Sequence, residues 1–237
     1  GHWSEPNRSG VPTTASVYAG YGDVHLVAVA SGERGLKGGR GAAQAAVAAV
    51  ASTFRAPSVD GLVTDRLGAA FAAAQSAVRE LDHGREATGE IAVEMAAAVI
   101  ERGRVTFARI GGGRLFVIES GGALSFPVTQ TVGFVGDETT QPDILTRALT
   151  LLPGDKLVLA TEATARTIAA DIEALAKGSS PQLIAQALVG AARRRGERGG
   201  LVAHLLEVRS EAASRPATGA LSRLSENPVG TVPVATG

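Results

Sequence analysis

The sequence contains no cysteine among its 237 residues. That absence excludes a disulfide framework, a thiol nucleophile and any zinc or iron site ligated by cysteine. Aromatic residues are also scarce, at 4% of the chain, whereas glycine occurs 30 times. A composition rich in small residues indicates closely packed helices and tight turns, in a chain long enough for one domain with a sizeable core.

The chain has no excess of charge of either sign. Its 23 Lys and Arg residues balance 23 Asp and Glu residues, so the formal net charge is zero. Nucleic-acid-binding proteins usually show a basic excess, and we therefore expect no nucleic-acid partner. No apolar run reaches the roughly 18 to 20 residues that span a bilayer, and no charged-then-apolar signal segment opens the sequence, so we expect no membrane insertion.

Composition divides the chain into three parts. Residues 1–14 are polar and predict an extended N-terminal segment, in which Gly1 and His2 resemble the remnant of an expression tag. Residues 15–209 carry the periodic apolar patterns of a folded domain. Residues 210–237 are rich in Ala, Ser, Thr, Pro and Gly, a composition typical of a flexible tail or linker.

Periodicity within the domain predicts an α+β fold. A hairpin is expected over 16–30, two helices over about 42–54 and 59–81, and a helix beginning at the N-cap Ser180 with Pro181 in its first turn. Further strands are predicted over 91–100, 104–110, 114–119, 123–128, 156–161 and 201–208. Strands, a helix pair, a β-meander, further helices and a closing strand do not follow a regular βαβ alternation.

Three segments carry a resemblance to a known family. The first is VAVASG over 27–32, followed by a glycine-rich loop and an alanine-rich helix. The second is VTFARIGGGRLFVI over 105–118, and the third is DILTRAL over 143–149, followed by LLPGDKLVLATEAT. In this order the segments resemble the protein phosphatase 2C (PPM) family of metal-dependent serine/threonine phosphatases. The resemblance implies an αββα sandwich, in which two antiparallel sheets are flanked by helix pairs.

The resemblance also implies where the family's two divalent metals would be held, mostly by carboxylates. At those positions this chain has Ser31 followed by Gly32 in place of an Asp-Gly pair, and Gly112 in place of the aspartate of a Gly-Asp-Ser-Arg turn. Glu162 stands where the family has the aspartate of Ser-Asp-Gly, and Gly199 falls near a late Asp-Asn pair. Neutral residues do not replace anionic ligands of hard cations. We therefore expect a degenerate metal site that binds no cofactor.

Two glycine-rich stretches beside this site predict contacts with an anion or a partner. Gly111 and Gly113 flank Gly112 in a turn whose backbone N–H groups suit an anion-binding nest, and Arg114 follows directly. Lys37 and Arg40 lie in the loop after the first segment. Hairpin closure and solvation are the simpler interpretations of both stretches.

These patterns lead to three functional hypotheses. The leading one is a catalytically inactive regulatory module, a cytoplasmic bacterial pseudophosphatase that binds a kinase, a phosphoprotein or another pathway component. The second is a divergent metal-dependent phosphatase with relocated carboxylates, using Asp23, Glu33, Asp137 and Glu162 around a single metal. The third is a sensor of a small ligand or nucleotide, which would bind in the degenerate cleft at the 111–114 turn.

Overall fold

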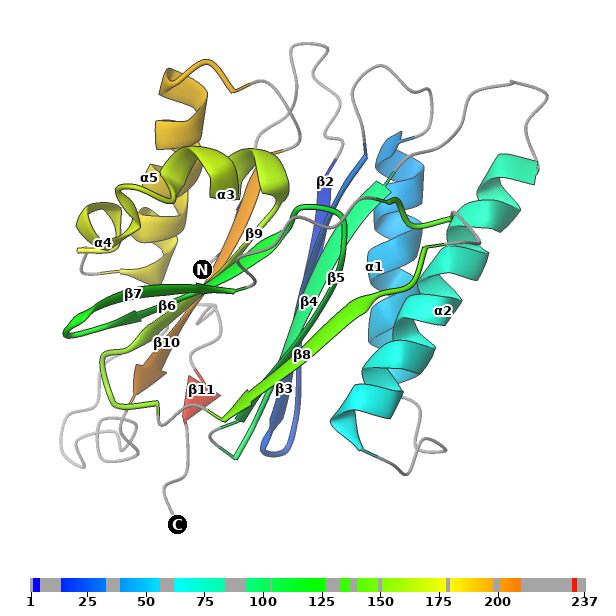
Figure 1. Ribbon diagram of the computed structural model, residues 1–237, viewed down its shortest axis with the longest axis horizontal. Coiled ribbons are helices and arrows are strands. Elements are labelled where there is room, and N and C mark those ends of the chain that lie inside the picture. The colour runs from blue at the N-terminus through cyan, green and yellow to red at the C-terminus, as the bar shows by residue number, and fades with distance from the viewer. Residues whose placement is uncertain are drawn as a thin grey trace, which may run out of the picture.

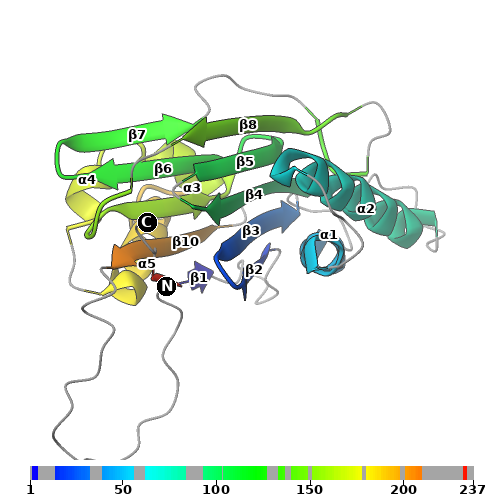
Figure 2. The same cartoon turned by 90° about the horizontal axis from the view of Figure 1, so that it is seen from below.

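The protein is described by a computed structural model that covers residues 2–4, 14–32, 39–55, 62–83, 93–102, 104–126, 133–136, 140–148, 151–177, 180–197, 201–209 and 232–233. Two antiparallel sheets pack face to face, and each carries helices on its outer face (Figures 1 and 2). The predicted α+β class and αββα sandwich are confirmed.

The first sheet is built from local hairpins and one distant strand. Its strand order is β2-β3-β4-β5-β8, with all neighbours antiparallel. The strands are β2 (Thr14–Tyr21), β3 (Val24–Gly32), β4 (Val93–Glu101), β5 (Arg104–Ile110) and β8 (Asp143–Ala148). Helices α1 (Gly39–Arg55) and α2 (Val63–His83) cover its outer face. The alanines of α1, among them Ala42, Ala43 and Ala46, are fully buried and allow this close approach.

The second sheet has the order β1-β10-β9-β6-β7, and β11 pairs with β10 in parallel. Its strands are β1 (His2–Ser4), β6 (Arg114–Glu119), β7 (Gly122–Phe126), β9 (Lys156–Ala160), β10 (Val202–Arg209) and β11 (Val232–Pro233). Helices α3 (Glu162–Ile168), α4 (Ile172–Leu175) and α5 (Pro181–Arg194) cover its outer face. Ser180 caps α5 as predicted, because its hydroxyl accepts the N–H of Leu183.

A separate apolar layer fills the space between the two sheets. Val29, Ala96 and Phe107 reach it from the first sheet, and Leu115 and Leu159 reach it from the second. Because successive side chains of a strand point to opposite faces, alternate residues of the central strands, such as Val27 and Val29 of β3, belong to this layer. The position of a side chain along its strand therefore tells whether it faces the helices or the other sheet.

Several sequence-based boundaries differ from the structure. Strand β8 was not predicted, and neither were the short strands β1 and β11. The second helix begins at Val63, and residues 56–61, which include its predicted start, lie outside the described residues. Of the tail, only Val232 and Pro233 are described, where they pair with β10. Among the described helices, none combines the length and the apolar character that crossing a membrane requires.

Candidate functional site at the edge of the sandwich

Four chain segments meet at one edge of the inter-sheet layer. They are the end of β3, the start of β4, the β5–β6 turn and the junction of β9 with α3. Ser31 of β3 is the cross-strand partner of Glu94 in β4, and a Cβ added to Gly112 would lie 2.3 Å from Cδ of Glu162. The structure thus brings together Ser31, Gly112 and Glu162, which the sequence placed in one site.

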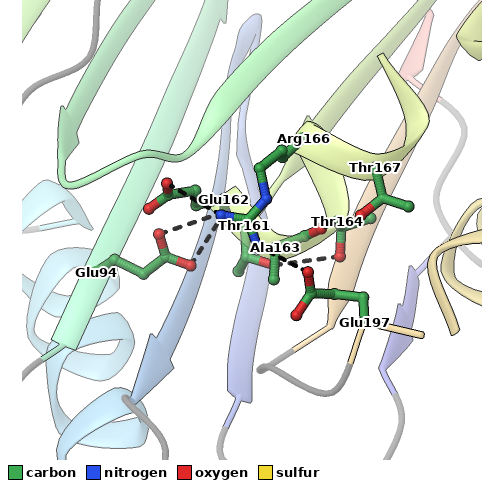
Figure 3. A network of polar contacts seen from close by, with 8 residues as sticks. All are labelled: Glu94, Thr161, Glu162, Ala163, Thr164, Arg166, Thr167 and Glu197. Carbon is green, nitrogen blue, oxygen red and sulfur yellow. Dashed lines mark hydrogen bonds and ion pairs between the residues drawn. The ribbon is translucent and has the colours of Figure 1, made fainter. Parts of the chain in front are cut away.

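Glu94 is the residue of this edge that sequence reasoning missed. Its carboxylate accepts the backbone N–H of Glu162 at 3.1 and 3.3 Å, so a side chain of the first sheet binds the start of α3 on the second (Figure 3). It also accepts a bond from the backbone of Gly112. A signal was present in the sequence, because Glu94 alternates with Ala96 and Ala98, which belong to the buried inter-sheet layer.

The electrostatics of this carboxyl group are strongly perturbed. Desolvation, reinforced by the neighbouring Glu162, raises the pKa of Glu94 to about 8. The backbone donors and Arg166 act in the opposite direction but do not compensate. Two neighbouring carboxylates at this edge therefore repel each other, and protonation of one of them or a nearby cation relieves the repulsion. Strongly shifted pKa values of this kind are concentrated at functional sites.

The glycine turn is required by what surrounds it. Gly111 has a φ of 89°, a left-handed conformation that favours glycine. A Cβ on Gly113 would lie 2.8 Å from Cβ of Ala96, and a Cβ on Gly112 would overlap the carboxyl group of Glu162. Glycine at position 112 is thus coupled to the long side chain at 162, which occupies the space beside it.

Arginines surround the carboxyl pair. Arg166 of α3 lies 3.9 Å from the carboxylate of Glu162 and 2.8 Å from that of Glu197, and the bond to Glu197 raises its pKa (Figure 3). Arg109, which is 1% exposed, pairs with Asp143 of β8 at 3.4 Å. Desolvation lowers the pKa of Arg109, and Asp143 opposes that shift. The edge therefore holds both signs of charge rather than an acidic cluster alone.

The donor set does not fit the two-ion centre that the resemblance implies. Within the described part of the chain, no group of three or more His, Cys, Asp or Glu residues is placed to hold a metal. Both oxygens of Glu94 already accept a backbone N–H, and Gly112 offers no side chain. Carboxylates in sufficient number to hold two hydrated divalent ions are thus not found among these residues.

The other predicted residues are placed as follows. Gly32 is buried, and an added Cβ would lie 2.6 Å from Cα of Gly39, so glycine permits the close approach of α1. Arg114 begins β6 directly after the turn. Arg40 lies in the first turn of α1. Asp23 lies in the β2–β3 turn, at the opposite end of β3 from Ser31 and thus outside the site. The positions of Glu33, Lys37, Asp137 and Gly199 are outside the described residues.

Comparisons with known proteins now identify the fold. No family model matches the chain, and no curated protein sequence matches it. Solved structures do: the serine/threonine phosphatase of S. agalactiae superposes with a TM-score of 0.74 at 17% identity, covering 86% of this chain and 97% of that one. The Mycobacterium tuberculosis serine/threonine phosphatase PstP/Ppp superposes with a TM-score of 0.72 at 18% identity, covering 86% of this chain and 95% of that one. The serine/threonine phosphatase Stp1 of Staphylococcus aureus superposes with a TM-score of 0.73 at 13% identity, covering 86% of this chain and 92% of that one.

The fold is therefore that of the PP2C-type (PPM) serine/threonine phosphatases, as the resemblance implied. The same likeness contradicts the prediction that the chain is not an enzyme, because the structures named above are all serine/threonine phosphatases. The sequence-based count of aspartates at the family's positions also overlooked Glu94, whose carboxyl group lies near that of Glu162 at this edge.

Proposed function

We propose that this protein hydrolyses phosphate monoesters carried by serine or threonine side chains of a partner phosphoprotein. The observation that carries the proposal is the convergence of Glu94 and Glu162 beside the Gly111–Gly113 turn at the edge of the sandwich. The fold supports the class of reaction by analogy only, since one fold can host many functions. The perturbed carboxyl pair is the argument from this chain's own residues.

Each residue of the edge has a role in this proposal. The side chain of Glu162 is 42% exposed and is the carboxylate that a water molecule can reach, so it orients the attacking water and accepts its proton. Arg166, at 61% exposure, and Arg114 supply the positive charge that phosphoryl oxygens require. Glu94 holds the start of α3, and with it Glu162, in place.

In the reaction, the water oxygen forms a bond to phosphorus as the bond from phosphorus to the serine or threonine oxygen breaks. One water proton passes to Glu162, the leaving oxygen takes up a proton from solvent, and inorganic phosphate departs. The dominant contributions are positioning and electrostatic stabilisation, as is usual in phosphoryl transfer.

The test is hydrolysis of an aryl phosphate and of a phosphoserine peptide by the full chain, measured in EDTA and in manganese buffers. We expect turnover that Glu162→Gln lowers at least 100-fold, in keeping with removal of a general base. Glu119→Gln is the matched control, because Glu119 is exposed at the far end of β6. Equal rates for the Glu162 variant and the wild type, or no turnover in any buffer, would refute the proposal.

A further inference from the structure

A buried cation lies in the inter-sheet layer close to the candidate site. Arg109 is the penultimate residue of β5, which ends directly before the Gly111–Gly113 turn. Its cross-strand partner in β4 is Ala96, which belongs to the inter-sheet layer, so the side chain of Arg109 faces the second sheet as well. That side chain is 1% exposed. Arginine is almost never fully buried unless a partner compensates its charge.

Asp143 compensates this charge only loosely. Nε and Nη2 of Arg109 both donate to the same oxygen, Oδ2 of Asp143, and each distance is 3.4 Å. Charge-assisted bonds of a guanidinium group are usually about 2.7 to 2.9 Å long, and the strongest pairs use two acceptor oxygens. Burial lowers the pKa of Arg109, and Asp143 opposes that shift without cancelling it. The guanidinium group would therefore gain from an anion that offers two oxygens at shorter range.

A path to the guanidinium group exists on the side of Asp143. Asp143 is the first residue of β8, the edge strand of the first sheet, and its side chain is partly exposed. Its carboxylate can therefore turn into solvent and leave the arginine to another anion. Arg109 is also near enough to Arg114 and Glu162 for their charges to act on it. The position left by Asp143 thus adjoins the proposed hydrolytic edge.

The charges around this position favour a dianion. Arg114 adds a second positive charge to that of Arg109. Burial raises the pKa of Glu94 to about 8, so at neutral pH this carboxyl group is mostly protonated and does not repel an anion. The charge of Glu162 is offset in part by Arg166, which lies 3.9 Å away. The planar guanidinium fork of arginine matches the oxygens of phosphate in a bidentate way.

We infer that Arg109 forms a subsite for a phosphate-type dianion, in which the anion replaces Asp143 as the partner of the guanidinium group. The inference rests on the proposed function in that it names a residue that would hold the phosphoryl group of the substrate or the phosphate released from it. Asp143 competes with the anion for the same donors. It therefore keeps the buried charge paired in the free protein, weakens binding of the anion and promotes its release.

The experiment is titration calorimetry of inorganic phosphate into the full chain at constant ionic strength and neutral pH. We expect Arg109→Met to raise the Kd for phosphate roughly 10-fold or more, and Arg109→Lys to raise it less. Asp143→Asn should lower the Kd roughly 5-fold or more, because it removes the competing charge. A merely structural ion pair predicts weaker binding in both the Arg109 and the Asp143 variants, so the opposite signs are the decisive readout.

Matched controls come from the opposite end of the same sheet. Glu101 and Arg104 are cross-strand partners there, so Glu101→Gln and Arg104→Met remove one charge of each sign from β4 and β5 far from the site. Both should bind phosphate like the wild type, and circular dichroism verifies that every variant is folded. No binding by the wild type, an unchanged Kd in Arg109→Met, or weaker binding in Asp143→Asn would overturn the inference.

Kinetics with a phosphoserine peptide distinguish the two sources of the anion. A higher KM in Arg109→Met assigns the subsite to the phosphoryl group of the substrate, whereas weaker product inhibition at an unchanged KM assigns it to released phosphate. Phosphate binding with the expected signs, but without hydrolysis of any phosphate monoester, would support the subsite and overturn the phosphatase proposal. Hydrolysis that depends on Glu162, with equal phosphate affinity in Arg109→Met and the wild type, would do the reverse.

Discussion

Removal of the Asp143 carboxylate should destabilise the fold more than removal of the arginine it contacts. Nε and Nη2 of Arg109 both donate to Oδ2 of Asp143, each at 3.4 Å. Arg109 is 1% exposed on the side chain, whereas Asp143 is 27% exposed. In Asp143→Ala the guanidinium keeps its charge in a desolvated place and loses this acceptor, whereas in Arg109→Met an apolar chain of similar length fills the space.

The magnitude follows from burial. Breaking a fully buried ion pair by removing one partner costs about 3 to 5 kcal/mol, and replacing the whole pair by apolar groups is often neutral. Because Asp143 is partly exposed and both bonds are long, we expect Asp143→Ala to lower the free energy of unfolding by about 2 to 3 kcal/mol, below the fully buried range. Arg109→Met should cost about 1 kcal/mol or less, since the remaining Asp143 can be solvated.

Urea unfolding followed by far-UV circular dichroism measures both variants, and the double variant Arg109→Met/Asp143→Ala completes the cycle. The double variant should resemble Arg109→Met rather than the sum of the two single changes. A loss in Arg109→Met equal to or larger than that in Asp143→Ala would refute the reasoning, because it would mean that the pair stabilises the fold through the arginine's charge.

Three further predictions concern the site and the opposite end of the first sheet. Because the pKa of Glu94 is raised to about 8, its ionisation costs stability as pH rises from 4.5 to 8. In urea unfolding in metal-free buffer, the unfolding free energy of Glu94→Gln should therefore exceed that of the wild type by roughly 2 to 3 kcal/mol at pH 8 and equal it at pH 4.5. Gly112→Ala should lower the free energy of unfolding by roughly 1 to 3 kcal/mol, because the added Cβ overlaps Glu162, and by less in a Glu162→Ala background. Gly121→Ala is the control, because its added Cβ meets no atom within 4 Å. Equal losses for Gly112→Ala in both backgrounds would contradict the packing argument. Burial lowers the pKa of His25, although Asp23 opposes this shift, so the unfolding free energy of the wild type minus that of His25→Gln should fall as pH falls below 6.5. Parallel stability curves for the two proteins would contradict this.

The layered architecture could be predicted from the sequence because local patterns specify most of it. The hairpins β2–β3, β4–β5 and β6–β7 pair strands that are neighbours in the chain and are joined by short turns, whereas the predicted meander is divided between the two sheets after β5. Strand β8 was missed because nothing local defines it. It lies at the sheet edge, includes three polar residues, and is positioned by pairing with β5, more than 30 residues earlier.

Of the two carboxyl groups, only that of Glu162 could be predicted from the sequence. Glu162 was recognised because it lies at the end of a strand in a recognisable segment, whereas Glu94 lies inside an apolar strand. Its partners are backbone N–H groups at positions 112 and 162, and a sequence does not display which backbone groups a distant side chain will reach.

The exchange of residues at this edge is best understood by volume and charge together. An aspartate at position 112 and a glutamate at 162 would compete for one space, since even a Cβ on Gly112 lies 2.3 Å from Cδ of Glu162. The glutamate at position 162 therefore requires glycine at 112. Glu94 then adds a second carboxyl group from β4, opposite Ser31 of β3. The loss of acidic residues at individual positions thus does not measure the charge available at the edge, which depends on the side chains that the fold brings there.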